Sequence, residues 1–91
     1  MTQDNAMAER IRNYILNRFA LAGKRSIGYD NALLEEGIVD SLGVLDLVSY
    51  LEQEFKISVS DEDLVPENFQ SIGRITLFVQ QKTSENSVRL Q

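Results

Sequence analysis

Apolar residues recur at steps of three and four along three stretches of the chain, which is the spacing of one face of an α-helix. This spacing predicts helices from residue 4 or 5 to about 21, from 41 to 55, and from 71 to about 82. The residues expected to face a shared core are Met7, Ile11, Tyr14, Ile15, Phe19, Leu45, Val48, Leu51, Phe55, Ile72, Ile75, Phe78 and Val79. The composition turns polar from 83 to 91, so we expect a frayed tail after a single domain spanning 1–82.

Two connections link the predicted helices. The first, residues 24–39, is long for a structureless loop in a small domain, and such loops are often functional. Its apolar residues are expected to pin it across the helices: Ile27, Leu33, Leu34 and Ile38. In the second connection, 57–60 alternates like a strand but is too short and has no second strand, so we expect an extended link. Ser60 and the carboxylates after it indicate a helix start, and Pro66 makes that element short or irregular.

A serine stands where the first connection meets the second long helix. Asp40 and Ser41 read as the start of this helix, and a hydroxyl in a first turn is exposed in a field that favours anions. Such a hydroxyl is well placed to carry a phosphodiester. The alternative is that Asp40 and Ser41 only cap the helix, as this pair does in many proteins without chemistry.

The residues that follow Ser41 suggest a docking surface. Leu42 and Val44 fall nearer the outside of the predicted helix, and exposed apolar residues beside a reactive serine are typical of a binding surface. Packing of either residue against the long loop is the alternative. Gly43 costs helix stability, so it either keeps the approach to Ser41 open or allows close packing with the loop.

Composition excludes several functions. The 91 residues include no cysteine and no histidine, which removes thiol chemistry, disulfides and the commonest general base and metal ligand. A net charge of −5 and a pI near 4.6 repel nucleic-acid phosphates. No apolar run reaches the length of a membrane span, and the first residues lack the features of a signal peptide. We therefore expect a cytoplasmic protein that does not bind nucleic acid and has no membrane span.

The order of these features resembles the acyl carrier protein family. The resemblance is carried by 33–42, with Asp-Ser-Leu at its end, and continues through Leu47-Val48, 51–55, 57–64 and 68–72, so that it covers roughly residues 8–82. It implies an all-α four-helix bundle with three longer helices, a short third helix and a long first loop. In this family the serine of the Asp-Ser-Leu motif receives a 4′-phosphopantetheine arm from coenzyme A, which designates Ser41 here.

The resemblance also implies a chain that is acted upon rather than a catalyst. Its partners would be a phosphopantetheinyl transferase, an adenylating acyl or amino-acid ligase or an acyltransferase, and downstream biosynthetic enzymes, with the carrier a monomer. The expected partner-binding residues are Asp40, Leu42, Val44 and Asp46. Carboxylates along the second and third helices would steer basic partners.

The kind of cargo is a further expectation. The region after Ser41 is less charged than in fatty-acid carriers, and the insertion at Pro66 resembles stand-alone aminoacyl or peptidyl carriers. The bulky Tyr50 and Phe69 are expected near the space between the second and third helices, where they would leave little room for a long chain. We therefore expect a discrete carrier for an amino acid or short acyl group. The alternatives are a general fatty-acid carrier and, in a different class, an unmodified helical adaptor.

Overall fold

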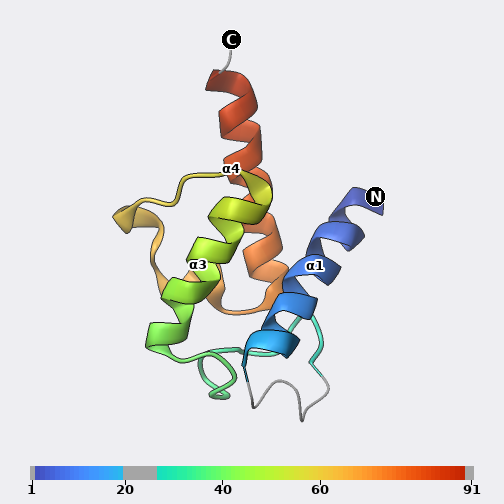
Figure 1. The fold of residues 1–91 in the computed structure, drawn as a ribbon, viewed down its shortest axis with the longest axis vertical. Coiled ribbons are helices and arrows are strands. Elements are labelled where there is room, and N and C mark those ends of the chain that lie inside the picture. Colours follow the sequence, from blue (N-terminus) through green and yellow to red (C-terminus); the bar gives the residue numbers. More distant parts are fainter. Residues whose placement is uncertain (1, 20–26, 90–91) are drawn as a thin grey trace.

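The structure is a computed structural model that describes residues 2–19 and 27–89, and within these ranges its regular elements are all helical. Three α-helices and two short 3₁₀ helices follow one another (Figure 1): α1 Thr2–Arg18, α3 Ser41–Phe55, η1 Asp61–Asp63, η2 Pro66–Phe69 and α4 Ile72–Arg89. No strand occurs in the described part of the chain, so the predicted all-helical class is confirmed there.

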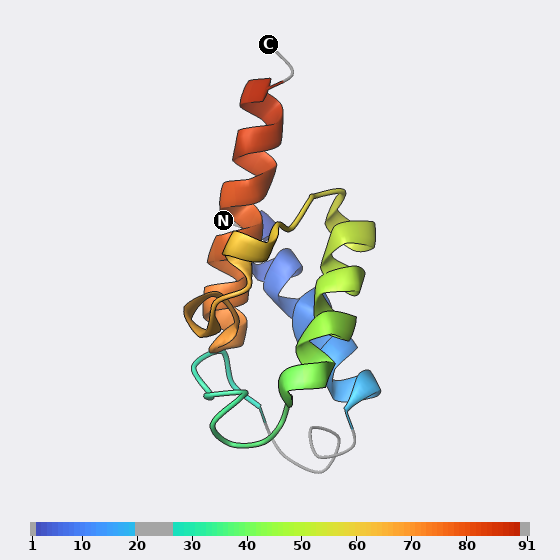
Figure 2. The same cartoon turned by 90° about the vertical axis from the view of Figure 1, so that its left-hand side faces the viewer.

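The three α-helices enclose one core, and the C-terminal part of α4 projects beyond the others (Figure 2). Ten side chains are almost wholly removed from solvent: Ile11, Ile15, Ile27, Leu33, Val39, Leu47, Leu51, Ile72, Ile75 and Val79. Burying an aliphatic side chain of this size contributes roughly 1.5–3 kcal/mol, so this shared core is what holds the helices together. The predicted stripes of α1 and α4 face it, with Ile11, Ile15, Ile75 and Val79 at its centre.

The inner face of α3 differs in part from the prediction. Leu45 does not face the core, because its side chain is 54% exposed, whereas Leu47 is fully buried. The buried positions step by four residues through Gly43, Leu47 and Leu51. Apolar residues occur on both sides of this line, so spacing alone could not choose between Leu45 and Leu47. Because Gly43 has no side chain, this face of α3 can pack closely against Phe19.

Tyr50 is also oriented differently from the prediction. Its ring stacks on that of Tyr14 at 4.1 Å between centroids, and its hydroxyl donates to the carbonyl of Arg10 at 3.2 Å. Tyr50 therefore joins α3 to α1 and does not narrow the space beside η2. Phe69, by contrast, is buried at the end of η2, as expected.

The long connection is pinned as predicted over the part that the structure describes. It crosses the end of the molecule at which α3 begins (Figure 1). Ile27, Leu33 and Ile38 are buried. The N–H of Leu33 donates to the carbonyl of Gln70 at 2.8 Å, and the N–H of Gly73 donates to the carbonyl of Tyr29 at 3.0 Å. These bonds fasten the loop to the start of α4. Residues 24–26 lie outside the described residues.

The region between α3 and α4 is irregular, as Pro66 predicted. Residues 57–60 form an extended link, Ser60 precedes η1, and Pro66 stands in the first turn of η2. Asp63 fastens this region to α4, because its Oδ2 lies 2.7 Å from Nζ of Lys82. The third helical element of the prediction is therefore two short pieces rather than one helix.

Three helix ends differ from the prediction. α1 spans Thr2–Arg18 rather than running from residue 4 or 5 to about 21, and Phe19 is no longer helical. α4 continues to Arg89 instead of ending near Lys82. The expected frayed tail over 83–91 is helical as far as Arg89. No proline or glycine follows Gly73 in the sequence to stop the helix, and polar residues on their own do not end one.

Candidate functional site

Ser41 is the first residue of α3, and its neighbours define how the helix begins. Asp40 occupies the N-cap position in an extended conformation, and its Oδ1 accepts the N–H of Gly43 at 2.6 Å. Such a cap stabilises a helix by about 1 kcal/mol. Before it, Gly37 turns the chain with a φ of 76°, and the buried Val39 anchors the approach. The capping interpretation of Asp40 is thus correct, and it leaves the hydroxyl of Ser41 available.

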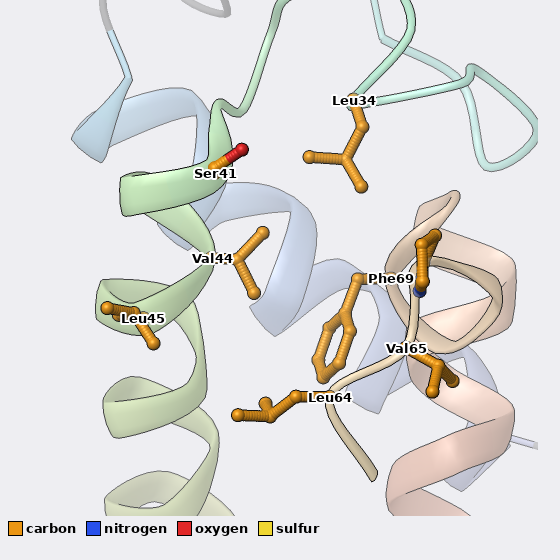
Figure 3. A pocket seen from close by; sticks show the side chains of 8 residues that line it. Leu34, Ser41, Val44, Leu45, Leu64, Val65 and Phe69 are labelled. Atoms are coloured by element: carbon orange, nitrogen blue, oxygen red, sulfur yellow. The ribbon is translucent and has the colours of Figure 1, made fainter. Parts of the chain in front are cut away.

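The hydroxyl of Ser41 is exposed, and no residue in the described ranges forms a hydrogen bond with it. It lies at the rim of a pocket of about 230 Å³. The pocket is enclosed by α3, the long loop and the segment around η2, through Leu34, Ser41, Val44, Leu45, Leu64, Val65, Pro66 and Phe69. Figure 3 shows Val44, Leu64 and Phe69 projecting into the space between α3 and η2, with Leu34 opposite Ser41. The site therefore combines one accessible hydroxyl with an apolar hollow.

The four residues predicted to contact partners differ in their surroundings. Leu42 is 76% exposed, as expected of a docking residue. Val44 is half-buried, lines the pocket and packs against the core, so it is less external than predicted. Asp40 caps the helix. Asp46 is half exposed, and its Oδ2 lies 2.6 Å from a guanidinium nitrogen of Arg18 on α1.

Other carboxylates of α3 are also bound within the chain. Glu54 forms an ion pair with Arg10 at 3.0 Å, and Glu52 accepts the N–H of Val59 at 2.9 Å. The sequence indicated that carboxylates lie along the second helix. It did not reveal that arginines of α1 pair with them, because that depends on how the helices pack.

Gly43 packs against Phe19, the residue that follows α1, rather than against the described part of the long loop. A Cβ at this position would lie 2.6 Å from Cε1 of Phe19 and 3.0 Å from Oδ1 of Asp40. Close packing therefore explains this glycine, although the residue that packs on it is Phe19. The spacing of apolar residues predicts that Phe19 faces the core but does not indicate this partner.

The described residues offer no arrangement for metal chemistry, since no three His, Cys, Asp or Glu side chains gather there in a way that could hold an ion. What the arrangement can do is accept a group on the exposed hydroxyl at the start of α3, where the helix field favours an anion such as a phosphodiester.

Comparison with known proteins identifies the class. Residues 9–79 match the family described as "Phosphopantetheine attachment site", and the chain therefore belongs to this family of carrier proteins. Carrier proteins of this family are not catalysts; they bear a covalent 4′-phosphopantetheine, which is the cofactor of this chain.

Three relatives illustrate the range of the family. A probable acyl carrier protein, PigG, from a Serratia species is 31% identical over 74 residues, covering 81% of this chain and 85% of that protein. An acyl carrier protein homolog from Mycoplasmopsis pulmonis is 34% identical over 73 residues, covering 80% of this chain and 96% of that protein. A D-alanyl carrier protein from Lactococcus lactis subsp. cremoris is 39% identical over 57 residues, covering 63% of this chain and 72% of that protein.

Membership of the family also indicates the kinds of enzyme with which the chain works. Carrier proteins work with synthetases and transferases, so the chain has enzyme partners of these kinds. Among its described helices, none is long and apolar enough to cross a membrane.

Proposed function

We propose that Ser41 is the residue that bears the phosphopantetheine arm. The observation that carries this proposal is the exposure of its hydroxyl at the first residue of α3, with no hydrogen-bond partner in the described ranges. Asp40 satisfies the N–H of Gly43, so attachment to Ser41 does not disturb the cap. When bound, the arm supplies the thiol that this chain lacks. Its phosphodiester would be linked to Oγ of Ser41.

Two other serines of the described chain are poorer candidates. Ser49 is exposed in the middle of α3, away from any helix start, and Ser71 is buried where its Oγ accepts the N–H of Arg74. Ser49 is therefore the appropriate control, because it shares a helix and an exposed position with Ser41.

The test is the intact mass of the protein after incubation with coenzyme A and a broad-specificity phosphopantetheinyl transferase. One arm is expected on the native chain and on Ser49→Ala, and none on Ser41→Ala. The Ser41→Ala variant should unfold at nearly the native temperature, since an exposed side chain without a partner contributes within about 0.5 kcal/mol. An arm that is retained in Ser41→Ala would exclude this serine. Failure of every variant to accept an arm would favour an unmodified helical adaptor instead.

We further propose that the arm carries an amino acid or a short acyl group for a discrete biosynthetic pathway. Two observations support this: the pocket beside Ser41 is only about 230 Å³, and one relative is named a D-alanyl carrier protein. An adenylating ligase is the loading enzyme that such a cargo calls for. A general fatty-acid carrier is the second candidate, because the pocket wall is apolar and relatives named acyl carrier proteins also match.

We also propose how the fold, the oligomeric state and the partner-binding surface fit a carrier protein. We take η1 and η2 together as the short third helix of a four-helix carrier bundle. We also propose a cytoplasmic monomer whose partners contact Asp40, Leu42, Val44 and Asp46, all at the Ser41 end of α3.

A further inference from the structure

Exposed apolar side chains gather around Ser41. Among the described residues, six large hydrophobic side chains are exposed, and four of them adjoin this serine or line the pocket beside it. We call these four the apolar collar: Leu42 at 76% exposed, Leu45 at 54%, and Leu64 and Val65 each at 37%. They come from two segments, α3 and the link before η2, that stand on opposite sides of the pocket (Figure 3). Apolar patches on a small protein commonly mark binding sites.

The acidic groups of α3 are, by contrast, occupied within the chain. Asp46 lies 2.6 Å from the guanidinium of Arg18, and Glu54 lies 3.0 Å from that of Arg10. Glu52 accepts a backbone N–H from Val59. A carboxylate next to an arginine presents little net charge at a distance, because the two fields largely cancel and salt screens the remainder. Beyond the exposed N-cap Asp40, the surface that α3 offers near Ser41 is therefore mainly apolar rather than acidic.

We propose that the enzyme that attaches the arm docks on the apolar collar through an uncharged, apolar patch of its own, and that Arg18 neutralises Asp46, the carboxylate of α3 beside Leu45, by binding it. The inference rests on the proposed function of Ser41. The occupant follows from the chemistry: the transferase must cover the neighbourhood of the hydroxyl that it modifies, and the collar adjoins that hydroxyl and the pocket beside it. The inference revises the expectation that carboxylates on α3 draw in basic partners.

The first test compares leucines of similar exposure at different places. Leu42→Gln and Leu45→Gln should each lower kcat/KM for arm transfer about fivefold to tenfold, the effect of removing an apolar anchor from an interface. Leu77→Gln is the matched control, because Leu77 is 51% exposed on α4 and lines no part of the Ser41 pocket. Its kcat/KM should remain at the native value. All three variants should keep the native melting temperature within a few degrees.

The second test asks whether Arg18→Gln lowers or raises kcat/KM for arm transfer. Arg18→Gln leaves Asp46 as an unpaired carboxylate one turn from Leu42 and adjacent to Leu45. If the transferase contacts this surface with an apolar patch, the unpaired charge must lose water on docking and kcat/KM should fall severalfold. If a basic patch meets the helix, the released charge should raise kcat/KM instead.

Arg10→Gln is the matched control for this change. It frees Glu54 in the same way, but at the far end of α3, thirteen residues or about 20 Å from Ser41. The kcat/KM of Arg10→Gln for arm transfer should equal that of the native chain. Circular dichroism melting of both variants checks that the loss of the arginine contacts with Phe19 and Phe55 leaves the fold intact.

The outcomes separate this inference from the assignment of Ser41. Apolar docking would be overturned if kcat/KM for arm transfer were the same for Leu42→Gln, Leu45→Gln and Leu77→Gln. It would also be overturned if kcat/KM for Arg18→Gln were unchanged or raised. Either result would leave Ser41 as the modified residue. An arm that appears on Ser41→Ala, or on no variant at all, would instead contradict the proposed function.

Discussion

The ring of Phe19 lies so close to Gly43 that a Cβ added to this glycine would approach Cε1 to 2.6 Å. The contact joins the residue that follows α1 to the first turn of α3, two residues after Ser41. It fixes how α3 begins relative to α1, and with it the side of α3 on which the serine hydroxyl is exposed. Gly43 is thus retained for packing, at the expense of intrinsic helix stability.

Gly43→Ala tests this contact. Alanine favours an isolated helix over glycine by up to about 1 kcal/mol, but here the added methyl group must displace Phe19 or the capping carboxylate of Asp40. Overpacking of this kind costs about 1–3 kcal/mol, so we expect a net loss in the free energy of unfolding, measured with urea. Phe19→Leu removes the obstructing ring edge, and the cost of Gly43→Ala should shrink in that background. A single Gly43→Ala variant more stable than the native chain would contradict the tight contact.

A second prediction concerns the fastening of the η1 and η2 region to α4. Asp63 accepts from the N–H and hydroxyl of Ser60 and pairs with Lys82 at 2.7 Å, so one carboxylate joins the link to the last helix. Asp63→Asn should lower the free energy of unfolding by about 1 kcal/mol, near the upper end for pairs that water still reaches. Asp61→Asn, at an exposed neighbouring position, should leave it unchanged. Equal stability of the two variants would mean that the Asp63 pair contributes nothing measurable.

The same pair predicts a pH dependence. The ammonium group of Lys82, with help from Ser60, holds the pKa of Asp63 below its ordinary value of 3.8. A lowered pKa in the folded state stabilises the protein fully above the unfolded value, and this contribution is lost as the pH falls through the folded pKa. The stability difference between the native chain and Asp63→Asn should therefore be constant from pH 7 to about pH 5 and shrink below about pH 4. A difference that grew on acidification would contradict the assignment.

Much of the site could be predicted from the sequence because its signals are local. α3 spans Ser41–Phe55 as expected, since Asp40 caps its start and Lys56, in a left-handed conformation, ends it. The pinning of the long loop followed from buried residues such as Leu33, and the broken third element followed from Pro66.

What the sequence could not predict depends on how the helices meet. The Arg18 pair with Asp46 joins residues 28 positions apart, and the stacking of Tyr50 on Tyr14 joins residues that are still more distant in the chain, so no local pattern indicates either contact. The burial of Leu47 in place of the predicted Leu45 also depends on how the helices meet. Several apolar residues near the start of α3 allow two inner faces, and the contact of Phe19 with Gly43 selects one of them.

A third variant examines the half-buried position beside Ser41. Val44 lines the pocket and packs on the core, so a carboxylate there loses both water and apolar contact. We expect Val44→Asp to lower the free energy of unfolding by about 1–3 kcal/mol and to slow arm transfer as well. Leu45→Asp introduces the same charge at a more exposed position, so its stability should change by less than about 0.5 kcal/mol. If both variants were equally stable, Val44 would belong to the surface, as the sequence first indicated.

The last prediction distinguishes the two kinds of cargo by what the pocket must do. A long acyl chain is sheltered only if the space bounded by Val44, Leu64 and Phe69 enlarges, and packed side chains resist such a change. The arm of the native chain is loaded with an octanoyl group in one sample and an amino acid in another, with the unloaded holo form as reference. Melting temperatures and amide spectra are then compared. For a carrier of short or polar cargo, amide shifts should stay near Ser41 and neither cargo should raise the melting temperature by more than a degree or two. An octanoyl group that raises it by about 4 °C, equivalent to roughly 1 kcal/mol in a domain of this size, and shifts Val48, Leu51 and Phe69 would favour the fatty-acid carrier.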